Sequence, residues 1–354
     1  MKLPRAPEFW WHRHRPAGYV LAPLGMIYGQ VSGRLMAREG KMVEVPVICV
    51  GNLVVGGAGK TPTALEVASV CRKLSLNPGF LTRGYGGRER GPLCVSVGIH
   101  TAAQVGDEAL LLAQFAPTVI AADRPSGAKL LAQLGADVVI MDDGFQNASL
   151  RKDLSLVVID SERGIGNGLV FPAGPLRAPL AAQIRMADAL IVLGEGNGGR
   201  AVRIAARAGK PTLRALSAPS RKRGLKRKPY LAFAGIADPI KFYKALATAG
   251  ATVGHTMSFP DHHLFTQAEC ETILSEARSR DLVPITTEKD RVRLNGGGDA
   301  AARLAAATET FPVRVGFEEP RRLITLITDA VSAHGTAYRL KPVISSRDAE
   351  KVPA

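Results

Sequence analysis

The chain of 354 residues is 46% hydrophobic and 22% charged, so it has room for two domains and is too apolar for an intrinsically disordered protein. Its formal net charge of +15 favours a polyanionic partner, either nucleic acid, an anionic membrane surface or a phosphorylated lipid, although a generally basic proteome would give the same excess. Four scattered cysteines without C-x-x-C spacing argue against a disulfide framework or a zinc site and fit a reducing cytoplasm.

The N-terminal segment, residues 1–38, has the composition of a membrane-interface segment. Both tryptophans, Trp10 and Trp11, lie beside histidines and arginines, and an uncharged stretch follows from Pro16 to Gly33. This stretch is barely long enough to span a bilayer, and it lacks the cleavage site of a signal peptide. We predict a helix that lies in the lipid headgroup layer; the alternative is a helix docked on the protein's own core.

A glycine-rich turn after the apolar run Val45–Val50 ends in Gly-Lys-Thr, and a helical pattern begins at Pro62. This order is typical of a phosphate-binding loop, whose backbone N–H groups surround the β- and γ-phosphates of a nucleotide. Val54 replaces the first glycine of the usual motif, so the alternative is an ordinary glycine-rich turn. The expected nucleotide-binding residues are Gly56, Gly57, Ala58, Gly59, Lys60, Thr61 and Pro62, with the Thr61 hydroxyl also a ligand of Mg²⁺.

Apolar runs and amphipathic stretches alternate through residues 39–216. This pattern predicts a P-loop NTPase-like α/β domain with a mostly parallel sheet and helices on both faces. The expected strands are Val45–Val50, Phe80–Thr82, Thr118–Ala122, Val138–Met141, Leu154–Ile159 and Leu190–Leu193. The expected helices are Thr63–Leu74, Glu108–Phe115 and Ser126–Leu134.

Acidic residues occur at the end of one expected strand and at the start of one expected helix of this domain. Asp142 and Asp143 follow a strand that ends at the same sheet edge as the loop, where they can bind Mg²⁺ or form a solvated turn. Asp107 and Glu108 precede an apolar helix. They can serve as N-cap and first-turn acid, or they can accept a proton or hold a metal near the transferred phosphoryl group.

Asp261-His262-His263 contains two adjacent histidines after an acid. A carboxylate that fixes the imidazole tautomer makes an Asp-His unit a general base. Zinc ligation lacks a third ligand at suitable spacing, and the remaining alternative is a polar loop before a helix capped by Thr266.

A basic linker, residues 217–229, is expected after the first domain, either as a solvated connection or as an anion-attracting patch. A smaller α/β domain is expected at residues 230–340, and a disordered tail at residues 341–354. The expected strands of the smaller domain are Tyr230–Gly235, Thr252–Met257, Val283–Thr286 and Pro312–Val315, and its expected helices are Pro239–Thr248, Ala268–Ser279 and Arg321–Val331.

The motifs, taken together and in order, resemble those of the tetraacyldisaccharide 4'-kinase family, the lipid A 4'-kinases of Gram-negative bacteria. The resemblance extends from about Pro16 to about Ala333. Its motifs are Gly51-Asn52, Gly56-Gly57-Ala58-Gly59-Lys60-Thr61-Pro62, Arg83-Gly84-Tyr85-Gly86-Gly87, Gly106-Asp107-Glu108, Asp142-Asp143-Gly144-Phe145-Gln146, Gly174-Pro175-Leu176-Arg177, Phe233-Ala234-Gly235-Ile236, Asp261-His262-His263 and Thr286-Thr287-Glu288-Lys289-Asp290.

The resemblance implies a kinase that uses ATP and Mg²⁺ to phosphorylate the 4'-hydroxyl of a tetraacylated glucosamine disaccharide 1-phosphate. It also implies a location on the anionic cytoplasmic face of the bacterial inner membrane, with neither nucleic acid nor an obligate protein partner. By motif, Asp107 would activate the sugar hydroxyl with the Asp261-His262 pair, His262 being favoured over His263. The implied metal-side residues are Thr61, Glu108 and Asp142, and the implied substrate-binding residues are Arg83, Arg124, Asp143, Gln146 and Arg177.

Two departures and two rival functions accompany this resemblance. Asn147 stands where the family usually has a histidine, so any role of that histidine in charge or proton handling is in doubt. Ala58 replaces the commoner threonine, which a backbone-binding loop tolerates. A membrane-cycling P-loop ATPase that acts as a positional switch would not need the Asp-His pair. A nucleic-acid binder would need aromatic residues among its basic residues, and the run from Arg221 to Lys228 has none.

Overall fold

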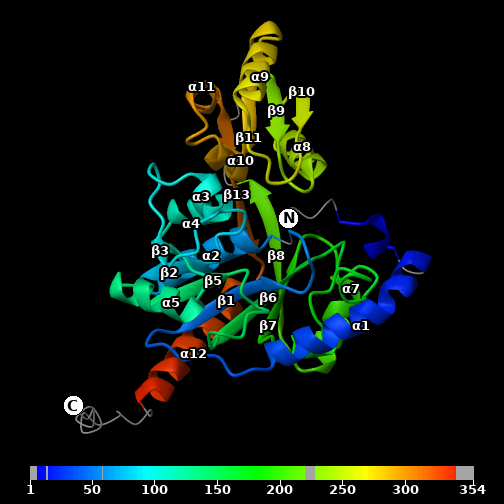
Figure 1. Ribbon diagram of the computed structural model, residues 1–354, viewed down its shortest axis with the longest axis vertical. Coiled ribbons are helices and arrows are strands. Elements are labelled where there is room, and N and C mark those ends of the chain that lie inside the picture. Colours follow the sequence, from blue (N-terminus) through cyan, green and yellow to red (C-terminus); the bar gives the residue numbers. More distant parts are fainter. Residues whose placement is uncertain (1–5, 13–14, 58, 220–227, 340–354) are drawn as a thin grey trace, which may run out of the picture.

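Two α/β units, a large lower one and a small upper one, make up the computed structural model, which describes residues 6–12, 15–57, 59–219 and 228–339 (Figure 1). A nine-stranded sheet forms the large unit and a four-stranded sheet the small one. The expected fold class, a mostly parallel sheet with helices on both faces and a second α/β unit, is confirmed. Ala58, the greater part of the basic linker and the tail 341–354 lie outside the described residues.

The large sheet has the strand order β13-β8-β7-β6-β1-β5-β2-β4-β3. All neighbours are parallel except β13 against β8 and β3 against β4. Along β1, Val47 and Cys49 face one hydrophobic core and Ile48 and Val50 face the other, which explains its continuous apolar sequence. The strands are β1 (Val47–Asn52), β2 (Pro78–Thr82), β3 (Leu93–Cys94), β4 (Thr118–Ile120), β5 (Val138–Asp142), β6 (Leu154–Asp160), β7 (Ala189–Leu193), β8 (Thr212–Pro219) and β13 (Val313–Phe317).

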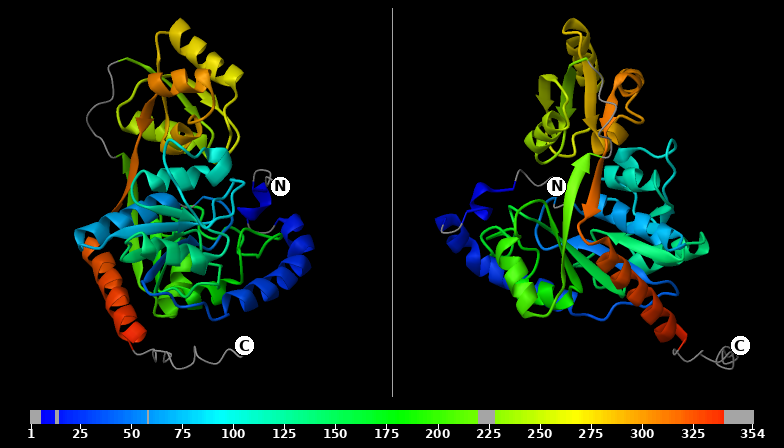
Figure 2. Two further views of the ribbon diagram at one scale, coloured as in Figure 1. Left: turned by 60° about the vertical axis from the view of Figure 1, so that its left-hand side comes forward. Right: turned by 180° about the vertical axis from the view of Figure 1, so that it is seen from behind.

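Helices cover both faces of this sheet (Figure 2). The helices α2 (Lys60–Lys73), α4 (Asp107–Ala113) and α12 (Pro320–Arg339) contribute to the core on one face. The helices α5 (Arg124–Gln133), α6 (Leu180–Met186) and α7 (Gly199–Arg207) contribute to the core on the other face. The short helix α3 (Ala102–Val105) precedes α4, with Gly106 between them.

The small unit is built around a parallel sheet with the order β10-β9-β11-β12. Its strands are β9 (Tyr230–Ala234), β10 (Val253–Ser258), β11 (Val283–Thr287) and β12 (Glu309–Phe311). Helix α8 (Pro239–Thr248) packs on one face, and α9 (Gln267–Ser279) and α11 (Asp299–Ala307) pack on the other. Helix α10 (Glu288–Arg293) begins directly after β11 and packs against α4 of the large unit.

The C-terminal boundary expected for the small domain is wrong. Strand β13 pairs antiparallel with β8, from Val313 opposite Pro219 to Phe317 opposite Ala215, so it belongs to the large sheet. Leu323 and Ile327 of α12 are buried in the core of the large unit. Residues 217–219 likewise form the end of β8 and are not a linker. Local apolar spacing indicated a strand and a helix, but the choice between two sheets depends on long-range pairing.

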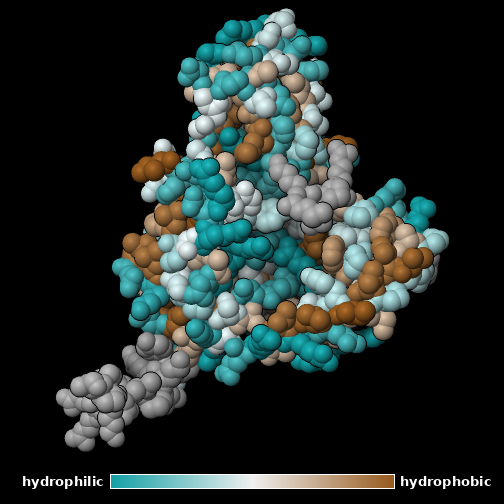
Figure 3. All heavy atoms as spheres, viewed as in Figure 1, coloured by the Kyte–Doolittle hydropathy of each residue, from teal (hydrophilic) through white to brown (hydrophobic). Residues whose placement is uncertain are grey.

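The expected N-terminal helix is present as α1 (Pro16–Met36), which follows a short 3₁₀ turn, η1 (Glu8–Trp10). One face is docked: a Cβ added at Gly25 would lie 2.7 Å from the carbonyl oxygen of Val170, so the glycine allows close approach. The other face exposes apolar side chains, which Figure 3 shows in brown along the lower right of the molecule. None of the helices in the described ranges is long and apolar enough for a bilayer crossing.

Gly51 of β1 packs against the turn after β5, so a methyl group added at this glycine should lower the stability of the protein. A Cβ at Gly51 would overlap Phe145, whereas nothing lies within 4 Å of a Cβ at Gly57. We expect Gly51→Ala to lower the free energy of unfolding by about 1–3 kcal/mol, because overpacking forces the turn to shift. Denaturant titration of Gly51→Ala and the control Gly57→Ala tests this; equal unfolding midpoints would contradict it.

Candidate active site

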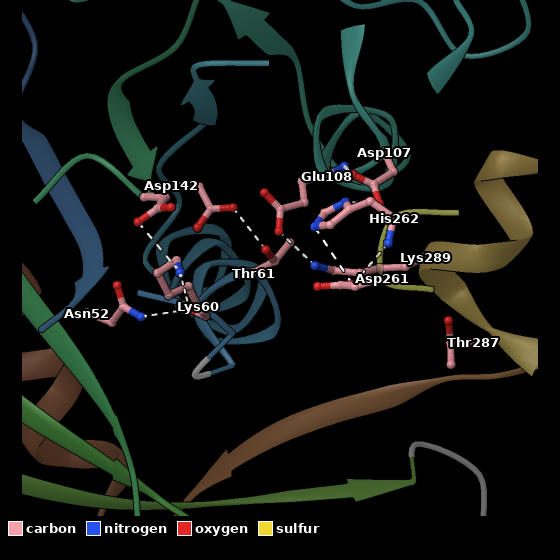
Figure 4. Close-up of polar contacts among 12 residues, drawn as sticks. Asn52, Lys60, Thr61, Asp107, Glu108, Asp142, Asp261, His262, Thr287 and Lys289 are labelled. Carbon is pink, nitrogen blue, oxygen red and sulfur yellow. Dashed lines mark hydrogen bonds and ion pairs between the residues drawn. The ribbon is translucent and has the colours of Figure 1, made fainter. Parts of the chain in front are cut away.

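The expected site residues lie at the carboxyl ends of the central strands of the large sheet, where parallel α/β folds bind their ligands. Helix α2, which follows the loop after β1, begins with Lys60 and Thr61, and the neighbouring strand β5 ends at Asp142. Figure 4 shows these residues on one side of the site and His262 with Asp107 on the other. Glu108 lies between the two groups, and a dashed line joins it to Lys289, which lies on the side of His262.

Lys60 is the first residue of α2 and is nearly buried. Gly59 before it takes a left-handed conformation, φ +80°, which glycine adopts without strain. Lys60 Nζ donates to the Gly56 carbonyl at 3.3 Å and lies 3.6 Å from an Asp143 oxygen. Burial lowers the pKa of Lys60, and Asp143 opposes that shift. The loop thus holds a partly desolvated cation beside the N-terminus of a helix, as a phosphate site requires.

Thr61 and Asp142 form the pair that fits a metal ion. The Thr61 hydroxyl donates to Asp142 Oδ2 at 3.0 Å, and Oδ1 of the buried Asp142 has no hydrogen-bond partner among the described residues. Burial, with repulsion from Glu108 and Asp143, raises the pKa of Asp142 to about 7. An unpartnered buried carboxylate oxygen beside a hydroxyl suits Mg²⁺, which prefers oxygen ligands.

Glu108, the third expected metal-side residue, is paired differently. Its Oε1 accepts a hydrogen bond from Lys289 Nζ at 2.7 Å, a contact from α4 of the large unit to α10 of the small one. The charge of Lys289 lowers the pKa of Glu108. Within the described ranges, no group of three or more His, Cys, Asp or Glu side chains has the arrangement of a metal site.

Asp107 and His262 meet across the junction of the two units. His262 Nδ1 lies 3.0 Å from Asp107 Oδ2. Because a carboxylate only accepts, Nδ1 carries the proton and the neutral ring presents Nε2 as an acceptor. The hydrogen bond to Asp107 raises the pKa of His262. Burial would raise the pKa of Asp107, but His262 and Arg293 together lower it well below its usual value.

This geometry corrects two expectations. The carboxylate that fixes the imidazole is Asp107 and not Asp261, whose Oδ1 lies 3.9 Å from Nε2 and accepts from the backbone N–H of His262. The N-cap of α4 is Gly106, and Asp107 is the first helical residue. The sequence suggested Asp261 as the partner of His262 because the two residues are adjacent. The actual partner comes from the other unit.

His263 is turned to a different partner, so the histidine facing the acid is His262. His263 Nε2 lies 2.9 Å from Glu269, and its ring stacks on Phe259. Thr266 caps α9, as expected, by accepting from the backbone N–H of Glu269.

The expected substrate-binding residues fall into two groups. Arg177, Asp143 and Gln146 gather beside Lys60: Arg177 Nη1 donates to Asp143 Oδ1 at 2.7 Å and to the Gln146 side chain at 3.3 Å. Arg124, only 3% exposed, donates to the Thr82 and Ala121 carbonyls at the ends of β2 and β4, and exposed Arg83 follows Thr82 in the chain. The structure therefore brings three of the five to the loop.

Two residues of the site received no role in the sequence analysis. Arg293 of α10 donates from Nε to Asp107 Oδ2 at 2.8 Å, and Asn52 Nδ2 donates to the Gly56 carbonyl at 3.0 Å. In the sequence, Arg293 is like any exposed basic residue in the last turn of a helix. The sequence therefore did not predict that its side chain is buried. Asn147 accepts hydrogen bonds from the backbone N–H and hydroxyl of Ser149 and so closes a turn.

Sequence comparison relates this chain to one family of known proteins. The family model described as tetraacyldisaccharide-1-P 4'-kinase matches residues 17–332. A tetraacyldisaccharide 4'-kinase from Methylobacterium sp. (strain 4-46) is 51% identical over 316 residues, covering 88% of this chain and 92% of its own. One from Bradyrhizobium diazoefficiens is 46% identical over 328 residues, covering 92% and 96%.

A solved structure is also similar over nearly its full length. The crystal structure of the apo form of LpxK from Aquifex aeolicus in complex with ATP superposes with a TM-score of 0.69 at 28% identity. The match covers 89% of this chain and 99% of that one. The resemblance inferred from the motifs is confirmed: the chain belongs to the tetraacyldisaccharide-1-P 4'-kinase family.

Proposed function

We propose that this chain transfers the γ-phosphoryl group of ATP to the 4'-hydroxyl of a tetraacylated disaccharide 1-phosphate, with His262 as the base. The observation that carries the proposal is the Asp107–His262 pair, which the two units assemble opposite the phosphate-binding loop. Phosphoryl transfer needs positioned phosphates, neutralised charge and a group that orients the attacking hydroxyl. The site offers residues for each requirement.

The loop residues and Lys60 would hold the β- and γ-phosphates, with the N-terminus of α2 directed at them. Thr61 and Asp142 would hold Mg²⁺, which when bound neutralises charge between the two phosphates. Glu108 would add its negative charge to this side of the site, with its Oε1 held by Lys289. Arg177 and Gln146 lie beside the loop and would contact phosphate oxygens, as would Arg124 and Arg83 farther along the sheet edge.

His262 Nε2 would take the proton from the sugar hydroxyl as the hydroxyl oxygen attacks the γ-phosphorus, while the bond from the γ-phosphorus to the β–γ bridging oxygen breaks and ADP leaves. Asp107 would stabilise the resulting imidazolium, since its Oδ2 already binds Nδ1. Asp107 is a poor base itself, because Oδ2 is taken by Arg293 and His262, and Oδ1 accepts from the Glu108 N–H. Asp261 would add negative charge near the ring. A positional-switch ATPase has no use for such a pair, and the family does not favour that rival.

A phosphoryl-transfer assay with the lipid disaccharide acceptor tests the function. We expect Lys60→Ala to abolish transfer, and His262→Ala to lower kcat by roughly 10²–10⁴-fold with little change in KM for ATP, because a base acts in the transition state. His263→Ala is the matched control, since His263 binds Glu269 instead. An acceptor-free reaction runs beside each assay. Full transfer by Lys60→Ala, or equal loss in both histidine variants, would contradict the assignment.

The pairing of His262 also predicts its titration. The hydrogen bond to ionised Asp107 favours the charged imidazolium, so the pKa of His262 is raised. We expect Asp107→Asn to lower that pKa, because the neutral amide no longer stabilises the positive ring. NMR titration of the His262 imidazole resonances in the wild type and in Asp107→Asn measures it. An unchanged His262 pKa in Asp107→Asn would refute the pairing.

For the location of the enzyme, we propose that the exposed face of α1 lies in the headgroup layer of the inner membrane, on its cytoplasmic side. This face carries aromatic and aliphatic side chains, and Arg15, Arg34 and Arg38 stand exposed near the two ends of the helix. Met186, exposed on α6 next to α1, extends the same surface. Apolar residues with flanking arginines suit an anionic interface. The apolar residues are Tyr19, Val20, Leu24, Met26, Ile27, Tyr28, Val31 and Leu35.

Two isoleucines of equal exposure make a matched test of this surface. Ile27 on α1 and Ile240 on α8 are each 63% exposed. We expect Ile27→Asp to lower the fraction bound to anionic vesicles by roughly tenfold or more, because a buried isoleucine contributes about 1.5–3 kcal/mol. Ile240→Asp should leave binding unchanged. Co-sedimentation measures both, and an equal response of the two variants would exclude α1 as the contact surface.

A further inference from the structure

One guanidinium group contacts Asp107 and also the backbone carbonyl that holds His262. Arg293, the last residue of α10, donates from Nε to Asp107 Oδ2 at 2.8 Å, and its Nη2 donates to the same oxygen. Its Nη1 donates to the Gly235 carbonyl oxygen at 2.6 Å. That same carbonyl accepts the backbone N–H of His262 at 3.1 Å. Arg293 therefore binds the carboxylate that holds the imidazole and the carbonyl that holds the histidine backbone.

The Gly235 peptide is fixed on its other side as well. Asp290 Oδ1 accepts from the Gly235 N–H at 3.0 Å and from Arg293 Nη1 at 2.6 Å. A Cβ at Gly235 would lie 3.1 Å from that Asp290 oxygen, so the backbone sits close against the cluster. His262 itself takes a left-handed conformation, φ +56°, which the surrounding contacts must maintain. The loop that carries the base is thus built on Asp290 and Arg293.

Because the residues of this cluster are buried, their hydrogen bonds and ion pairs need good geometry. Only 1% of the Arg293 side chain and 4% of the Asp107 side chain are exposed, and Asp290 is fully buried. A buried charge needs its partners in good geometry, since water cannot replace them. The planar guanidinium presents its donors as a rigid fork, which fixes the direction between two acceptors; a lysine would offer only a point charge.

We propose that Arg293 is a positioning residue for the transfer reaction: by binding Asp107 and the Gly235 carbonyl at once, it sets the distance and angle between Asp107 and His262. The inference rests on the proposed role of that pair. It assigns Arg293 no contact with either substrate. Its function is to align the base, so its loss should appear in kcat and leave ATP binding intact.

The test compares Arg293→Gln and Arg293→Lys in the full-length enzyme. We expect Arg293→Gln to lower kcat about 100-fold, the effect of misplacing a catalytic group by about 1 Å, with KM for ATP unchanged. Arg293→Lys should recover only part of kcat, because one ammonium cannot bind both acceptors in the same geometry. By NMR, the downfield resonance of the His262 Nδ1 proton should be lost in Arg293→Gln and weakened in Arg293→Lys.

Two control variants separate positioning from simple attachment of the units. Arg291→Gln removes a cation from the same helix, where the Arg291 side chain donates to Asn295 Oδ1. Lys241→Gln removes an exposed ion pair to Asp160 that also joins the two units. Both variants should keep kcat. Thermal unfolding checks the fold of each variant, and if Arg293→Gln does not fold, kcat and the proton resonance of Arg293→Lys decide.

The outcomes distinguish this inference from the function on which it rests. A folded Arg293→Gln with wild-type kcat, or with the His262 resonance retained, would overturn the positioning role while His262→Ala remained inactive. An equal loss of kcat in Lys241→Gln would also overturn it, because attachment of the units would then suffice. Full activity of His262→Ala would overturn the catalytic pair itself, and the inference with it.

Discussion

The site depends on one buried ionic contact across the junction of the two units. Asp107 comes from the large unit and is bound by Arg293 and His262 of the small one. Each of these groups would be costly to bury alone, since a charge removed from water requires compensation. These three groups depend on one another. The position of the small unit, the ionisation of Asp107 and the orientation of His262 are therefore coupled. Lys289 and Glu108 form a second ionic contact across the junction, in which Glu108 follows Asp107 in α4 and Lys289 lies about one turn before Arg293 in α10.

The two halves of the site treat their carboxylates differently. Asp107 and Asp143 are each saturated by cations, Asp143 by Lys60 and Arg177, and they remain ionised. Asp142, buried between other acids, has an oxygen with no partner in the described part of the chain. Saturated carboxylates serve as fixed elements that hold other groups, whereas an unsatisfied one remains available for a ligand.

Much of this could be predicted from the sequence, because the signals were local. The loop before Lys60, the acids at strand ends and the histidine pair all follow or precede elements with clear apolar spacing. Three features could not be predicted, and each depends on contacts between distant segments. Arg293 resembles a solvated helix-end residue, Asp261 stands next to His262 in sequence but not at its Nδ1, and β13 is a strand whose partner lies before the small unit.

The pairing of β13 with β8 has a consequence for how the chain folds. The whole small unit is inserted between two adjacent strands, since Pro219 and Val313 lie opposite each other. Closing so long a loop has an entropic cost that grows with its length. A small unit that has already folded brings its own ends together and shortens the effective loop. A chain made from its N-terminus can complete the large sheet at this edge only after the insert and β13 have been synthesised.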